Sequence, residues 1–199
     1  LCARSLDVSA ASHRKASLVR LAKNGGKGAA VIAGLYVADN MNFTHAIQID
    51  ADGQHDLAAV TDFLDQARHN PQALVCGYPV YDQTAPLARL WGRELTNFWV
   101  HVNTRSKALK DAMCGFRVYP IAQTLPVLPS VRTRRMDFDP DIAVRLLWAG
   151  VPVINRPVRV TYPKDGISHF RGFSDNMRIS RLHAEHFCTM LLRRMGLAK

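Results

Sequence analysis

The chain has 199 residues, enough for one domain with a sizeable hydrophobic core but short of two ordinary domains. A hydrophobic content of 48% with 21% charged residues is typical of a globular protein and excludes a disordered chain. The formal net charge of +10 favours polyanionic partners, namely nucleic acid, phosphorylated small molecules or an anionic membrane surface.

Strand-like and helix-like patterns alternate along most of the sequence. The expected elements are a strand at 17–21, a helix at 27–39, a strand at 43–50, a helix at 56–70, a strand at 73–79 closed by its proline, a helix at 86–103, a β-like segment at 111–120, a helix at 137–150, an extended segment at 151–163 and a helix at 174–195. This order predicts an α/β fold with a largely parallel sheet. Ligands of such sheets bind beyond the carboxyl ends of the strands.

An acidic cluster, "QIDADGQHD", follows the strand expected at 43–50. Asp50 and Asp52 point the same way on an extended chain, and Gln54 continues the series with one more oxygen donor. No Lys or Arg occurs between Tyr36 and Asp65, so we expect a cation from outside the chain. Oxygen ligands suit Mg²⁺ or Mn²⁺, which also accept phosphate oxygens. The alternative is a solvated acidic loop whose last carboxylate caps the next helix.

A glycine turn, "NGGKGAA", precedes the helix expected from Lys27. A turn that opens a helix can offer backbone N–H groups to an anion, and the lysine favours a phosphate or nucleotide contact. The sequence matches neither the Walker A pattern nor GxGxxG, so an ordinary glycine turn remains the alternative.

The C-terminal part is basic, and "SHFRGFSDNMRI" alternates aromatic and cationic residues. The helix after it places an apolar stripe beside several arginines, which suits an anionic membrane surface. The stripe comprises Ile179, Leu182, His186, Phe187, Met190 and Leu191. Packing of the stripe on the rest of the domain is the alternative. His183 and His186 are one turn apart, but no third metal ligand accompanies them.

Taken in order, "NGGKGAAVIAGL", "HAIQIDADGQHD", "DAMCGFRVYP" and "FDPDIAVRLLWAGVPVINRPVRVTYP" resemble glycosyltransferase family 2, which has the GT-A fold. The likeness is to bacterial members related to polyprenyl-phosphate sugar synthases, enzymes of cell envelope biosynthesis. It implies inverting transfer of a sugar from a nucleotide diphosphate sugar to a lipid-linked or lipid-phosphate acceptor, with Mg²⁺ or Mn²⁺ as cofactor.

By motif match, the resemblance assigns Asp50 and Asp52 to the metal and the donor diphosphate, and Gln54 to the metal. Asn24, Gly26 and Lys27 fall in the segment that lines the nucleotide site.

If the acceptor is a hydroxyl group, a carboxylate should remove its proton. Asp139 and Asp141 match the family's acidic pair, and Asp111 is a further candidate. Capping of a helix by acidic residues is the alternative for the pair. A lipid phosphate is already an anion and needs no base. Arg117 is then a candidate phosphate ligand.

For acceptor or phosphate binding we also select three basic residues of the C-terminal part, namely His169, Arg171 and Arg178.

Two motifs of the family, a strand of the "VVIPVYN" type and a second ending in "DDGS", are absent from this sequence. We therefore expect an N-terminally truncated GT-A domain at 1–165, followed by a basic amphipathic helical segment at 166–199. The alternatives to a glycosyltransferase are a nucleotidyltransferase and a non-catalytic remnant that binds nucleic acid or membrane. Acidic residues cluster at a strand end and most aromatics follow core spacing, so nucleic acid is not the expected partner.

The four cysteines have no metal-ligand spacing, and no apolar run approaches 18 residues. These features favour a cytoplasmic protein, and the basic C-terminal helix favours a peripheral position at the inner face of the membrane.

Overall fold

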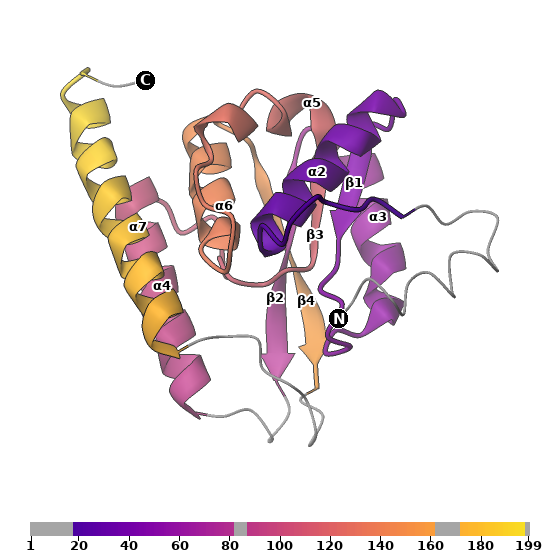
Figure 1. Cartoon of the computed structure of the whole chain (residues 1–199), viewed down its shortest axis with the longest axis horizontal. Helices are drawn as coiled ribbons and strands as arrows, with labels where there is room; N and C mark the ends of the chain where they lie inside the picture. Colours follow the sequence, from indigo (N-terminus) through magenta and orange to yellow (C-terminus); the bar gives the residue numbers. More distant parts are fainter. Residues whose placement is uncertain (1–17, 82–86, 162–171, 198–199) are drawn as a thin grey trace.

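The computed structural model describes residues 18–81, 87–161 and 172–197. A four-stranded sheet lies between helices in this part of the chain (Figure 1). The elements are α2 (Lys27–Asn40), β1 (His45–Gln48), the 3-10 helix η1 (Leu57–Ala59), α3 (Val60–His69), β2 (Leu74–Tyr81), α4 (Leu87–Thr104), β3 (Arg117–Pro120), α5 (Ile121–Thr124), the 3-10 helix η2 (Leu128–Ser130), α6 (Phe138–Trp148), β4 (Val153–Val160) and α7 (Gly172–Arg194).

The sheet is mixed, with the strand order β1-β3-β2-β4. β3 pairs antiparallel with both β1 and β2, whereas β2 and β4 pair in parallel over their whole length. Three strands therefore run in one direction and β3 runs against them. The predicted α/β class is confirmed, and the arrangement is consistent with a GT-A-like fold.

Side chains alternate along each strand between two apolar layers. In β2, Leu74 and Cys76 join the layer that contains residues of α2, α4 and α6, whereas Val75 joins the layer that contains Phe63 of α3. Phe63 is wholly buried, and its ring meets that of Phe116 edge-on at 4.7 Å. The sheet is thus covered by helices on both faces.

The carboxyl ends of β1, β2 and β4 meet at one end of the sheet together with the start of β3. Gln48, the last residue of β1, pairs with Arg117, the first residue of β3. On the other side of β3, the Gly77 N–H donates to the Phe116 carbonyl at 2.8 Å. The loops at 49–56 and 111–116 therefore lie together at this end, where ligands of α/β sheets bind.

Two of the predicted strands are not observed as predicted. The strand expected at 17–21 is absent from the described residues 18–21, and the strand expected to end at Pro79 is longer. Residues 18–21 form no strand, and Val19 and Leu21 are 50% and 43% exposed. β2 continues beyond Pro79 to Tyr81 because β3 pairs with it only at Val75 and Cys76. Beyond that point one flank of β2 is an edge, where proline is tolerated.

The β-like segment at 111–120 is a strand only in its last four residues. Its first part is a loop organised by Asp111, whose carboxylate accepts hydrogen bonds from the N–H groups of Met113 and Cys114. A side chain thus replaces strand partners for these backbone groups.

The C-terminal helix α7 lies alongside α4 at the outer flank of the molecule (Figure 1). Ile179, Leu182 and His186 of the predicted stripe are buried, whereas Phe187 and Leu191 are 37% and 39% exposed. The first half of the stripe therefore packs on the domain, as the alternative to membrane contact predicted. In the described part of the chain, no helix is long and apolar enough to cross a membrane.

His183 lies in the α4–α7 contact and gives the fold a predictable acid sensitivity. The side chain is buried, stacks on Trp99 at 6.4 Å, and has no hydrogen-bond partner for either ring nitrogen. Burial first, and the neighbouring His186 second, lower the pKa of His183 to about 4. The unfolded chain therefore takes up a proton below about pH 6.5 that the folded chain binds only near pH 4.

We expect stability to fall as the pH drops from about 6.5 towards 4, and His183→Leu to weaken this dependence. Thermal unfolding followed by circular dichroism at several pH values measures both. His69→Gln, a change at an exposed histidine, is the control and should unfold like the wild type. An equally steep pH dependence in His183→Leu would contradict this assignment.

Candidate active site

The glycine turn before α2 packs against the Arg134 carbonyl and thereby fixes the position of Lys27. Gly26 has a φ of 91°, and a Cβ atom there would lie 2.5 Å from the Arg134 carbonyl oxygen. That carbonyl accepts hydrogen bonds from the N–H groups of Gly28 and Ala29 at 2.8 and 3.3 Å. The Asn24 side chain accepts from the Gly26 N–H at 3.0 Å. The amides of Gly26, Gly28 and Ala29 are thus used inside the chain, so the contribution of this turn to phosphate binding is expected from the Lys27 side chain.

The Lys27 ammonium joins two carboxylates from different parts of the fold. Its Nζ lies 2.7 and 2.9 Å from the two oxygens of Asp50, just beyond β1, and 2.6 Å from Oδ2 of Asp139 in α6. Asp50 and Asp139, predicted as a donor ligand and a base, are thus brought together. Lys27 also corrects the expectation that only a cation from outside the chain could neutralise Asp50.

Electrostatics hold this triad in its charged form. Burial acts to lower the pKa of Lys27, but Asp139 and Asp50 outweigh it and raise that pKa. Burial acts to raise the pKa of Asp139, but Lys27 and Arg117 outweigh it and lower that pKa. Asp139 is therefore a poor proton acceptor in this arrangement.

Two side chains of the sheet, linked by hydrogen bonds, fix the other oxygen of the Asp139 carboxylate. The Gln48 side-chain N–H donates to Asp139 Oδ1 at 3.0 Å, and the Tyr119 hydroxyl donates to Gln48 Oε1 at 2.9 Å. Gln48 and Tyr119 are buried in the sheet. Sequence reasoning missed both, although a glutamine two residues before Asp50 on an apolar strand was a visible signal.

Asp50 lies in a recess made by Gly115. A Cβ atom on Gly115 would stand 2.2–2.4 Å from all three carboxyl atoms of Asp50. The glycine in "DAMCGF" therefore leaves room for this carboxylate, which would have to shift to make room for a larger residue.

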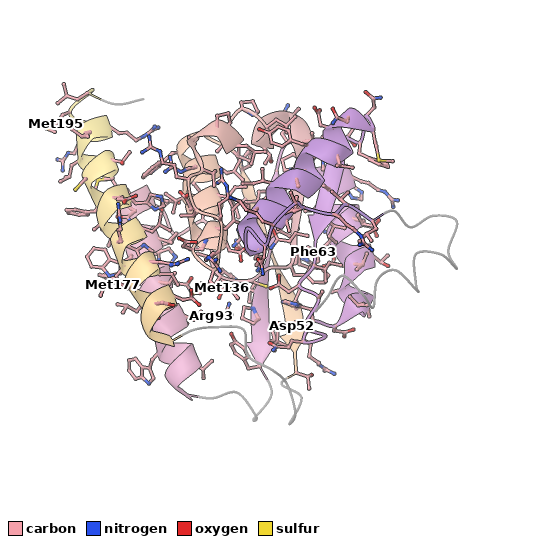
Figure 2. The ribbon with its side chains drawn as sticks, viewed as in Figure 1. Asp52, Phe63, Arg93, Met136, Met177 and Met195 are labelled. Atoms are coloured by element: carbon pink, nitrogen blue, oxygen red, sulfur yellow. The ribbon has the colours of Figure 1, made fainter. Side chains whose placement is uncertain are left out.

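The other acidic-loop residues are more open. Asp52 is exposed, and its Oδ1 accepts from the Gln54 N–H at 3.1 Å. Asp50 and Asp52 both act electrostatically on His55, whose ring lies 5.6 Å from that of Phe116. Burial is the main cause that lowers the pKa of His55, against these two carboxylates. Figure 2 shows Asp52 and Arg93 towards the end of the sheet where β2 and β4 finish.

A divalent cation fits the chemistry of this loop, although it would need ligands from a substrate. Asp50, Asp52 and Gln54 offer oxygen ligands alone. Among the described residues, no three His, Cys, Asp or Glu side chains gather into a site that could hold a metal by themselves. Mg²⁺ is commonly held by one or two carboxylates together with substrate phosphates.

Asp111 organises the neighbouring loop instead of standing free. Its Oδ1 accepts from Arg93 Nη1 at 2.7 Å as well as from the backbone of the loop. The Arg93 guanidinium also lies 5.8 Å from the centre of the Tyr81 ring. Sequence reasoning missed Arg93; as a cation within the apolar helical pattern of 86–103, it could have been selected.

Asp141 is wholly buried at the start of α6 and ties that helix to α7. It contacts His186 Nε2 at 2.9 Å, Arg145 Nε at 2.5 Å and the Thr133 hydroxyl at 2.8 Å. Burial acts to raise its pKa, but His186 and Arg145 outweigh this effect and lower it. This position is structural, so we do not retain Asp141 as the base.

Arg117 is also structural. It is wholly buried, and its three nitrogens donate to the carbonyls of Cys114, Asp139 and Ala112 at 2.6–2.9 Å. This arrangement leaves the guanidinium no access to an acceptor phosphate. Arg178 is exposed on α7, and residues 169 and 171 lie outside the described residues.

Comparison with known proteins supports the resemblance seen in the motifs. No protein-family model matches the sequence. The chain is similar to a dolichyl-phosphate beta-glucosyltransferase of Dictyostelium discoideum, with 24% identity over 172 residues. The alignment covers 82% of this chain and 51% of that protein, so the chain spans about half the length of the curated relative it matches. The similarity supports a protein of glycosyltransferase type.

We expect Gly115→Ala to destabilise the chain by about 1–3 kcal/mol, the usual cost of overpacking, because the added methyl group meets the Asp50 carboxylate. Urea unfolding measures the change. Gly34→Ala is the matched control, since a Cβ atom there meets nothing within 4 Å inside α2. The control should be neutral or up to about 1 kcal/mol more stable. Equal stability of Gly115→Ala and wild type would contradict the recess.

Proposed function

We propose that the chain transfers a sugar from a nucleotide diphosphate sugar to a lipid phosphate, by an inverting, metal-dependent reaction. The observation that carries this proposal is the meeting of Asp50, Lys27 and Asp139 at the ligand-binding end of the sheet. The similarity to a protein named for dolichyl phosphate and glucose supports both the transfer and the acceptor class.

On the donor side, Asp50, Asp52 and Gln54 would hold Mg²⁺ or Mn²⁺. The ion would supply positive charge against the diphosphate when bound. Lys27 stands beside Asp50, where its ammonium can neutralise charge that develops on the leaving diphosphate. In the transfer, the bond from the anomeric carbon to the diphosphate oxygen breaks and its electrons stay on that oxygen. An acceptor oxygen forms the new bond from the opposite face.

The state of the carboxylates favours a phosphate acceptor over a hydroxyl acceptor. Asp139 and Asp141 both have lowered pKa values and are engaged by cationic side chains. A general base works best with a pKa near the operating pH, so neither is tuned to remove a hydroxyl proton. A lipid phosphate arrives as an anion and needs no such base.

Contact with a membrane surface would bring the chain to a lipid acceptor, and two apolar faces support it. On α4, Trp91, Leu95 and Phe98 follow helical spacing and are 77%, 61% and 56% exposed. At the end of α7, Leu191 and the following Met195 are exposed beside the exposed Arg194. An apolar face flanked by cations suits an anionic bilayer surface. A peripheral cytoplasmic location belongs to the same proposal.

A transfer assay tests the function directly. The full chain is incubated with radiolabelled UDP- and GDP-linked sugars, Mn²⁺ and vesicles that carry a polyprenyl phosphate. We expect label to pass into the lipid extract with one of the donors, and to stay in water when EDTA is present or the lipid phosphate is omitted. Label that never reaches the lipid with any donor would contradict the proposal.

We further expect Asp52→Ala to abolish Mn²⁺-dependent binding of nucleoside diphosphate while leaving the fold intact. Asp52 is exposed, and its removal deletes a ligand and relieves repulsion within the acidic loop. Calorimetric titration with UDP and GDP, with Mn²⁺ and then with EDTA, measures the binding. Asp39→Ala, at an exposed carboxylate near the end of α2, is the control. Normal metal-dependent binding by Asp52→Ala would discredit this site.

A further inference from the structure

We propose that Lys27 competes with the divalent cation for Asp50, so that the cation binds weakly until a diphosphate arrives with it. The proposal rests on the metal assignment made under the proposed function. It assigns Lys27 a positioning role that determines when the site accepts a metal.

The competition follows from the geometry of the ion pair. An ammonium group has three N–H donors, and Lys27 has three carboxylate oxygens within 2.9 Å. Two of them are the two oxygens of Asp50. Each oxygen keeps a second lone pair, but a divalent cation on Asp50 repels the ammonium held on the same carboxylate, so Asp50 binds the cation at full strength only when Lys27 moves away from it.

Asp139 determines where the ammonium goes when Asp50 is taken. The Asp139 side chain is 4% exposed and is held on its other oxygen by Gln48, whereas the Asp50 side chain is 24% exposed. Asp139 is thus the fixed partner and Asp50 the accessible one. Lys27 keeps Asp139 as its anchor and regains free N–H donors beside the metal.

The N–H donors that Lys27 regains can bind the phosphate oxygens of a diphosphate. A cation alone replaces one positive partner of Asp50 with another and leaves the ammonium only partly bonded. A cation that carries a diphosphate brings phosphate oxygens that the released ammonium can bind. Binding of metal and diphosphate should therefore be cooperative, and reciprocity requires each to strengthen the other equally.

The first test measures Mn²⁺ binding in the absence of nucleotide, by electron paramagnetic resonance of free Mn²⁺. We expect Lys27→Met to bind Mn²⁺ roughly tenfold more tightly than wild type, within the usual range for coupled sites. Lys23→Met removes an exposed lysine four residues earlier and should leave the affinity unchanged. Unchanged or weaker Mn²⁺ binding in Lys27→Met, or no binding in either chain, would overturn the proposal.

A double-mutant cycle links the gain to the carboxylate. In an Asp50→Asn background, Lys27→Met should no longer improve Mn²⁺ affinity, because the contested ligand is gone. A gain that persists without Asp50 would show that Lys27 acts only through general charge, which also overturns the proposal.

A third test uses the wild-type chain alone, so its result does not depend on whether the variants fold. In a Mg²⁺ titration followed by NMR, the Lys27 ammonium signal should shift in step with saturation of the site, and added UDP or GDP should lower the Mg²⁺ concentration needed. A Lys27 signal that stays constant while the site saturates, or an absence of saturation even when UDP or GDP is present, contradicts the competition.

These readouts separate the inference from the proposed function. Competition at Asp50 without any lipid-linked sugar product supports the inference and contradicts the function. Sugar transfer with unchanged Mn²⁺ affinity in Lys27→Met gives the opposite result.

Discussion

The contact of one lysine with two carboxylates is the constraint around which the binding end of this fold is organised. Lys27 comes from the start of α2, Asp50 from the loop after β1 and Asp139 from the first turn of α6. Each reaches the others only because neighbouring groups allow close approach: the Arg134 carbonyl seats the glycine turn, and Gly115 leaves room for Asp50. Loss of the Lys27–Asp139 contact would leave the almost wholly buried Asp139 carboxylate without its ammonium partner, which is costly.

Buried charge recurs throughout the same region and serves geometry more than stability. Asp111 with Arg93, Asp141 with Arg145 and His186, and Arg117 with three carbonyls all lie around the carboxylate pair. The attraction within such a buried pair offsets the cost of desolvation but adds little net stability. Each buried charge can, however, pair with only a few groups, which fixes the local geometry. Asp111 and Arg117 hold the loop at 111–116 in place, and Asp141 joins α6 to α7.

Much of this could be predicted from sequence, because local patterns carry it. Helices α2, α3, α4, α6 and α7 lie close to their predicted ranges, since apolar spacing and turn residues act over a few residues. The direction of β3, the end of β2 and the loop at 111–116 depend on pairing with distant strands, which periodicity does not report. The partner of Asp50 was missed for the same reason: Lys27 is 23 positions away, and only the fold brings it near. Asp139, Asp141 and Arg117 are all buried and look equally available in the sequence, and only their partners in the fold separate them, because Asp139 alone of the three contacts Lys27.

The most direct measurement is an anomalous-difference map from crystals of the full chain grown with Mn²⁺ and a nucleoside diphosphate. We predict one manganese peak within bonding distance of an Asp50 oxygen, with phosphate density on its other side and the Lys27 ammonium still on Asp139. Manganese bound away from Asp50, or a diphosphate seated where neither Asp50 nor Lys27 reaches it, would contradict the central claim that this triad is the donor site.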